Sequence, residues 1–367
     1  MNPPSACSRS LPVDALKAVA AQCIVLHHFA WYGPLSEQAA QLGPAADGLI
    51  DGFAAYGRYA VAVFLVVGGY LSALTLPPQG LSFRLAPAQL GFERYLRLVV
   101  PFAVALLFAI ACNLVARQWM EHESLGSPPQ WQQLLAHLLF LHSLLGVESL
   151  SAGVWYVAID FKLYVLFVLL IWLGQRFSCR HASAEFLSPA VVVIVALVGL
   201  ASLFHFNRDE GWDVTPLYFF GAYSLGIAAA WAQRSGQRLL LLAMLSAAGL
   251  ALLVEFRDRL GVAAIAAILL SHPWTSASSR VSPLLAYLGR TSYALFLVHF
   301  PVYQLVSAAF VRAGSGEPVH GLYGLGLAWL LSLAAADQLH RHIEQPFQRW
   351  SKRRLSVCVG KSSTVSR

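Results

Sequence analysis

Long apolar stretches alternate with short polar gaps along almost the whole chain. Each stretch is close to the roughly 20 residues that an α-helix needs to cross a bilayer core about 30 Å thick. Ten of them predict transmembrane helices, separated by polar or proline- and glycine-rich segments. They run near residues 13–32, 55–76, 95–116, 153–174, 187–206, 214–232, 238–256, 260–279, 284–311 and 321–340.

An eleventh stretch, near 131–147, is short, contains His137 and His142, and begins with two glutamines. Its length does not decide whether it crosses. The distribution of basic residues does, because cytoplasmic loops of membrane proteins collect Lys and Arg.

With a cytoplasmic N-terminus and 131–147 not crossing, seventeen of the 25 Lys and Arg residues fall on the cytoplasmic side, seven of them from Arg341 onward. If 131–147 crossed, this basic end of the chain would lie outside. We therefore predict ten crossings, both termini in the cytoplasm, and an interfacial or re-entrant helix near 131–147. The segment 33–54 has three acidic residues and no Lys or Arg, which fits the outer face.

The composition agrees with an all-α, polytopic membrane helix bundle, since 57% of the 367 residues are hydrophobic and 12% are charged. The net charge of +7 does not indicate nucleic-acid binding, because the excess lies in the predicted inner loops and tail. The five cysteines form no C-x-x-C motif. The charged first apolar stretch does not resemble a cleavable signal peptide. We expect one membrane domain, 1–346, and a disordered, basic cytoplasmic tail, 347–367.

Ionisable residues inside the predicted spans are candidates for function, because charge is costly in a bilayer. In the first span, Lys17 and His28 are eleven residues apart, so they share a helix face about 16 Å apart along the axis. Asp14 lies one turn before Lys17, and the predicted topology places His28 toward the outer half of the membrane. A structural alternative is that Lys17 reaches the headgroups and His28 bonds a neighbouring helix.

The fourth span carries Tyr156, Asp160 and Tyr164 at every fourth position, at a depth comparable to that of His28. A carboxylate near a histidine is a general-base arrangement, because it fixes the ring tautomer and stabilises the imidazolium. A buried polar pair that only joins helices is the alternative.

Two further features carry candidate chemistry. Arg94 and Arg97, three residues apart where a helix enters the membrane from inside, can grip a phosphate, or they can simply anchor the helix. His299 lies near the middle of the ninth span, where a histidine can equally be structural. The histidines show no metal-ligand spacing, and we predict no metal site.

These features, in this order, resemble the acyltransferase-3 family of bacterial multi-spanning membrane proteins. The matching motifs are Asp14–Lys17 with His28, Phe64–Leu71, Arg94 and Arg97 with Pro101, Trp155–Tyr164, Gly289–Val302 with His299, and Glu344 with Pro346. Gly68 departs from the family pattern, which usually has serine there.

The resemblance implies an O-acyltransferase of the bacterial cytoplasmic (inner) membrane. It would move an acyl group, acetyl from acetyl-CoA, to a hydroxyl of a sugar, cell-surface polysaccharide, lipid-linked sugar or related acceptor, with no permanently bound cofactor. Arg94 and Arg97 would hold the CoA phosphates and Lys17 would guide the donor. His28 would act as general base or transient acyl carrier, oriented by Asp160, with His299 as a second polar contact.

A proton-coupled transporter is the main alternative, because intramembrane Asp, Lys and His also build proton relays. No internal repeat or paired helix break supports it. A family-like protein that has lost activity is a third possibility, which Gly68 makes conceivable.

Overall fold

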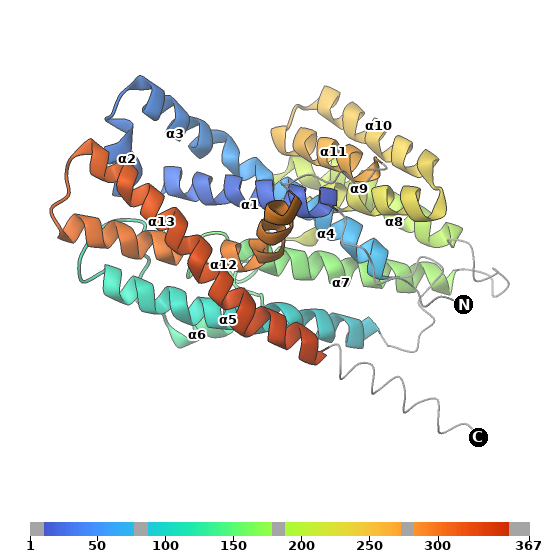
Figure 1. Cartoon of the computed structure of the whole chain (residues 1–367). Coiled ribbons are helices and arrows are strands. Elements are labelled where there is room, and N and C mark those ends of the chain that lie inside the picture. Colours follow the sequence, from blue (N-terminus) through green and yellow to red (C-terminus); the bar gives the residue numbers. More distant parts are fainter. Residues whose placement is uncertain (1–10, 77–86, 178–187, 273–281, 352–367) are drawn as a thin grey trace, which may run out of the picture. The chain divides into compact units, whose positions relative to one another are not determined.

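The computed structural model describes residues 11–76, 87–177, 188–272 and 282–351, and these residues form helices and no strand (Figure 1). The predicted all-α class is therefore confirmed. The α-helices are α1 (Leu11–Trp31), α2 (Pro34–Ala40), α3 (Pro44–Tyr56), α4 (Val61–Thr75), α5 (Pro87–Ala116), α6 (Trp131–Leu138), α7 (Val154–Arg176), α8 (Pro189–Phe204), α9 (Pro216–Ser235), α10 (Arg238–Val254), α11 (Asp258–Ser271), α12 (Ser282–Arg312) and α13 (Pro318–Leu339).

Each of the ten predicted spans overlaps mainly with one α-helix, these helices being α1, α4, α5 and α7–α13. Residue 187 of one span and residues 273–279 of another lie outside the described residues. Seven helical segments of the described residues are long and apolar enough to cross a membrane, which indicates a multi-pass membrane protein. At 14 residues, α11 extends only about 21 Å, less than a bilayer core. The number of crossings and the side of the termini stay predictions.

The short elements differ from the pattern in the sequence. Within 131–147 only the eight residues of α6 are α-helical, about 12 Å, too short to cross. The chain then turns, with positive φ at Phe140 and Gly146. The predicted outer loop 33–54 holds α2 and most of α3, which the apolar pattern did not reveal.

The C-terminal helix is longer than its apolar stretch. A π-helical turn at His340–Glu344 follows α13, and residues 345–351 continue as α-helix. The first five residues of the predicted tail are therefore helical, and the remainder, 352–367, lies outside the described residues.

The chain divides into two compact units. Unit 1 comprises Met1–Ile24, Tyr56–Ala88 and Ala158–Ser292, and unit 2 comprises Val25–Ala55, Gln89–Val157 and Tyr293–Arg367. The chain passes from one unit to the other within α1, α3, α5, α7 and α12.

In unit 1, α9 is the central helix and packs against α4, α8, α10 and α11 (Figure 1). Buried residues lie on all its sides, including Phe220, Tyr223 and Trp231, as expected for a helix enclosed by others. Glycines bring α9 and α4 into backbone contact. A Cβ at Gly69 would overlap the carbonyl oxygen of Tyr223, and one at Gly226 would overlap that of Val66.

In unit 2, small residues and aromatic rings form the contacts between neighbouring helices. Gly321 and Gly324 of α13 face α2, where a Cβ would meet Leu35 at 2.6–2.7 Å. On α5, the Tyr95 hydroxyl donates to the Leu138 carbonyl oxygen at the end of α6, 2.9 Å away. The Phe102 ring packs edge-on against Phe140 just beyond it, with centroids 5.4 Å apart.

The α4–α9 contact gives a direct test of this packing. We expect Gly226→Ala to lower stability by about 1–3 kcal/mol, because the added methyl group forces two backbones apart. Gly249→Ala on α10 is the matched control, since a Cβ there has nothing within 4 Å and alanine favours a helix. Thermal unfolding in detergent compares the two, and an equal midpoint in both variants would contradict the contact.

Candidate active site

The predicted site residues divide between the two units. His28, Arg94, Arg97 and His299 belong to unit 2, whereas Lys17 and Asp160 belong to unit 1. We therefore describe the surroundings of each group within its own unit.

In unit 2, His28 of α1 and His299 of α12 form a direct hydrogen bond. The distance from His28 Nδ1 to His299 Nε2 is 2.7 Å, and the two rings lie almost parallel, with centroids 5.0 Å apart. His28 is 8% exposed and His299 is fully buried. The structure therefore brings together two of the three predicted catalytic residues.

The direction of this bond follows from a third group. The other ring nitrogen of His299, Nδ1, lies 3.0 Å from the carbonyl oxygen of Leu295 and must donate to it, because a carbonyl only accepts. In a neutral ring this leaves Nε2 of His299 as the acceptor. His28 then donates from Nδ1, and its Nε2 carries the lone pair of a base.

The family resemblance predicts that Asp160 orients His28 and that His299 is a second polar contact. In unit 2 it is His299 that holds the Nδ1 nitrogen of His28. A role for Asp160 at this ring stays a prediction.

Gly153, just before α7, makes room for the His28 ring. Its φ is +81°, and a Cβ there would lie 3.3 Å from His28 Cε1 and 3.0 Å from Phe296 Cζ. The rings of Tyr32 and Phe300 contact His28 as well, with centroids 5.9 and 6.2 Å from its own. His28 is thus enclosed by aromatic rings and a glycine that permits close approach.

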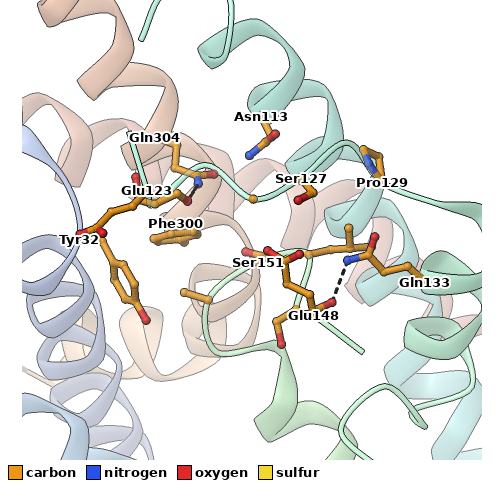
Figure 2. A pocket seen from close by; sticks show the side chains of 15 residues that line it. Tyr32, Asn113, Glu123, Ser127, Pro129, Gln133, Glu148, Ser151, Phe300 and Gln304 are labelled. Atoms are coloured by element: carbon orange, nitrogen blue, oxygen red, sulfur yellow. Dashed lines mark hydrogen bonds between the residues drawn. The ribbon is translucent and has the colours of Figure 1, made fainter. Parts of the chain in front are cut away.

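A cavity of about 180 Å³ adjoins these residues in unit 2 (Figure 2). Tyr32 and Phe300 form part of its wall, and Ala152 brings the wall to the residue before Gly153. The rest of the lining is mostly polar residues and comes largely from the segment between α5 and α7. It consists of Asn113, Glu123, Ser124, Gly126, Ser127, Pro129, Gln133, Glu148, Ser149, Leu150, Ser151 and Gln304.

Hydrogen bonds hold this irregular segment in place. Gln133 Nε2 donates to the Glu148 carbonyl oxygen at 2.8 Å (Figure 2), and Gln304 Nε2 donates to that of Ser124 at 2.6 Å. His137 Nδ1 bonds the Gln133 carbonyl oxygen at 2.7 Å, so its Nε2 accepts from the Leu150 N–H at 3.1 Å. Burial lowers the pKa of His137, which favours the neutral ring that this pattern needs.

In unit 1, Asp160 of α7 lies beside α4. A Cβ at Gly68 would be 3.2 Å from Asp160 Oδ1 and 3.4 Å from the ring of Tyr223. The Tyr223 hydroxyl donates to Ser72 Oγ at 2.7 Å. The motif with Gly68 and the motif with Asp160 therefore meet in space.

The remaining predicted residues occupy helix positions in both units. Lys17 is half-buried on α1, and Gly289 of α12 approaches the same helix so closely that a Cβ would lie 2.5 Å from the Asp14 carbonyl oxygen. On α5, Arg94 is half-buried and Arg97 is exposed, one turn apart. Within the described parts of the chain, no three His, Cys, Asp or Glu side chains are grouped to hold a metal ion.

Sequence reasoning missed the cavity and the direct partner of His28. Most of the lining residues lie outside the helices, at 123–129 and 148–152, where the sequence has no helical periodicity. His28 and His299 are 271 positions apart. The local signal that could have been used is Gly153, a turn-forming residue at the start of the predicted span 153–174.

Comparison with known proteins gives one match. A family model described as an acyltransferase domain, Acyl_transf_3, matches residues 12–337, nearly the whole chain. No curated protein and no solved structure matches the chain. The matched range includes His28, Asp160 and His299.

The role of Gly153 can be separated from its backbone strain. We expect Gly153→Ala to destabilise the protein more than Gly146→Ala, whose φ of +63° is also left-handed but whose Cβ would have nothing within 4 Å. The control measures the cost of a positive φ, about 1–2 kcal/mol. The further loss reports crowding of His28 and Phe296. Equal shifts of the thermal unfolding midpoint in both variants would contradict this close approach.

Proposed function

Because the chain belongs to the acyltransferase-3 family of membrane acyltransferases, we propose that it transfers acetyl from acetyl-CoA to a hydroxyl of a sugar or a sugar-containing acceptor. The acceptor would be a cell-surface polysaccharide or a lipid-linked sugar, and the protein would reside in the inner membrane of a bacterium. The observation that carries the proposal is the directed hydrogen bond from His28 to His299.

In the proposed reaction, the acceptor O–H proton moves to His28 Nε2 while its oxygen attacks the thioester carbonyl carbon. The C–S bond then breaks and the proton passes to the CoA sulfur, which yields an O-acyl ester and free CoA. His299 stabilises the imidazolium by accepting from Nδ1. This is the role that a base-orienting group has in general-base catalysis.

The donor would bind through Arg94 and Arg97 at the cytoplasmic end of α5. Their one-turn spacing suits two guanidinium groups on one phosphate, and charge-assisted bonds of this kind are strong. Lys17 on α1 carries a positive charge that would attract an anionic donor. An acyltransferase family model favours this reaction over transport by the same ionisable residues.

His28 gives the sharpest test of the reaction. We expect His28→Ala to lower kcat by about 10²–10⁴-fold, the usual loss of a general base. His27→Ala is the matched control, because His27 bonds the Phe53 carbonyl oxygen instead. The readout is CoA release together with O-acyl ester in the acceptor by mass spectrometry.

For His299, a positioning residue, we expect His299→Gln to retain more activity than His299→Ala, because the glutamine oxygen can still accept from His28. The pH profile of kcat should shift in both variants. Wild-type ester levels in His28→Ala at normal protein abundance would refute the proposal.

Arg97 tests the donor site. We expect Arg97→Ala to raise KM for acetyl-CoA about 10- to 150-fold with a smaller change in kcat, since one charge-assisted contact contributes about 1.5–3 kcal/mol. Arg238→Ala is the control, an exposed arginine on α10 that is also predicted to be cytoplasmic. An unchanged KM in Arg97→Ala would exclude this contact.

A further inference from the structure

We infer that the unit 2 cavity is the acceptor subsite, and that it takes an uncharged or amine-bearing sugar ring and excludes anionic acceptors. The inference rests on the proposed function, which leaves the acceptor and its place of binding open. Four features of the cavity carry it: its size, its unsatisfied polar atoms, its charge and its contact with the surroundings of His28.

The size suits one small ring. The cavity volume of about 180 Å³ equals that of about six water molecules. Glutamine and histidine hydrogen bonds within the protein hold its walls together. A site held in this way loses little entropy on binding.

Two buried polar atoms of the lining lack a protein partner. Neither Ser151 Oγ nor Asn113 Oδ1 has a hydrogen-bond partner among the described residues, and Ser151 is only 6% exposed. Buried polar atoms are almost always satisfied, so a partner from the cavity is expected. Sugar hydroxyls can donate to both atoms and accept from the serine.

The rest of the lining suits a polyhydroxylated ring. Carboxylates such as those of Glu123 and Glu148 accept hydrogen bonds from hydroxyl groups through two oxygens. The Glu148 carboxylate lies close to Gly126, where a Cβ would be 3.2 Å from Oε1. The rings of Phe300 and Tyr32 offer aromatic faces against which the C–H face of a sugar can pack.

The charge of the lining selects among such rings. It contains two carboxylates and, within the described part of the chain, no lysine, arginine or histidine. An anionic sugar would bring a like charge next to Glu123 and Glu148, whereas a neutral ring would not and an amine would be attracted. The same pair would also exclude the phosphates of the donor from this cavity.

The cavity shares its inner wall with the surroundings of His28. Tyr32 and Phe300 line it and contact the His28 ring, and their own centroids are 5.2 Å apart. A ring held here would therefore lie within one side-chain layer of the proposed base.

Binding can be measured without any acyl donor. The full-length protein in detergent is mixed separately with methyl glucoside, methyl glucosaminide and methyl glucuronide, which carry a neutral, a cationic and an anionic group on the same ring. Saturation-transfer NMR reports which ring contacts the protein. We expect the glucoside and glucosaminide signals to exceed the glucuronide signal at least fivefold. Equal signals for all three, or none for any, would overturn the inference.

Variants of the lining show whether the sugar binds in this cavity. Ser127→Trp, at an exposed position of the lining, should abolish the glucoside signal. Leu145→Trp, 64% exposed on the same segment but outside the lining, should retain it. The double variant Glu123→Gln/Glu148→Gln should raise the glucuronide signal to that of the glucoside. A glucoside signal that survives Ser127→Trp, or a glucuronide signal unchanged in the double variant, would place the binding elsewhere.

The binding and transfer measurements can reject the subsite and the proposed reaction independently of each other. Acyl transfer with no sugar signal would reject this subsite and leave the proposed reaction intact. A selective sugar signal without CoA release in the presence of acetyl-CoA would support the subsite and reject the reaction.

Discussion

The hydrogen bond between His28 and His299 has one direction, and the reaction proposed for unit 2 depends on it. A helical carbonyl, that of Leu295, fixes the proton on His299 Nδ1, so that His299 can only accept at Nε2. His28 must then donate from Nδ1, which leaves its Nε2 as a base. The backbone of α12 therefore sets the tautomer of a ring on α1, without a carboxylate at that nitrogen. A neutral partner has a further advantage in a buried site, because it adds no second charge to desolvate.

Close packing keeps this pair in register. Tyr303, one turn after His299, stacks on Phe29 with centroids 4.6 Å apart and donates its hydroxyl hydrogen to the Phe29 carbonyl oxygen. Gly33, with φ +104°, lets the Tyr303 ring approach, since a Cβ there would lie 3.1 Å from the hydroxyl oxygen. The end of α1 is thus fixed by the same face of α12 that holds His28. In an apolar bundle, such close contacts and hydrogen bonds replace the hydrophobic drive between helices.

Helices and motifs could be predicted because apolar length and spacing are properties of a local stretch. The short α2 shows the limit, since it has no apolar stretch long enough for a span and depends on packing against α13. The site was harder, because depth along a span says nothing about lateral position. The sequence predicts similar depths for His28 and Asp160, but depth could not identify His299, 271 positions away, as the residue at His28 Nδ1. The cavity lining was beyond prediction, because most of it comes from residues 123–129 and 148–152, on either side of the predicted helix near 131–147, where no periodicity marks the chain.

Gly68 departs from the family pattern, and its surroundings give a structural reason for the glycine that does not require a loss of activity. The Tyr223 ring fills the space beside Gly68, and its hydroxyl bonds Ser72, one turn further along the same face of α4. A side chain at 68 would compete with that ring, because a Cβ would already lie 3.4 Å from Cε2 and 3.2 Å from Asp160 Oδ1. The glycine, the tyrosine and the Ser72 hydroxyl are therefore one arrangement. The hydroxyl missing at position 68 has a counterpart on the next turn, so Gly68 alone is no argument for an inactive protein.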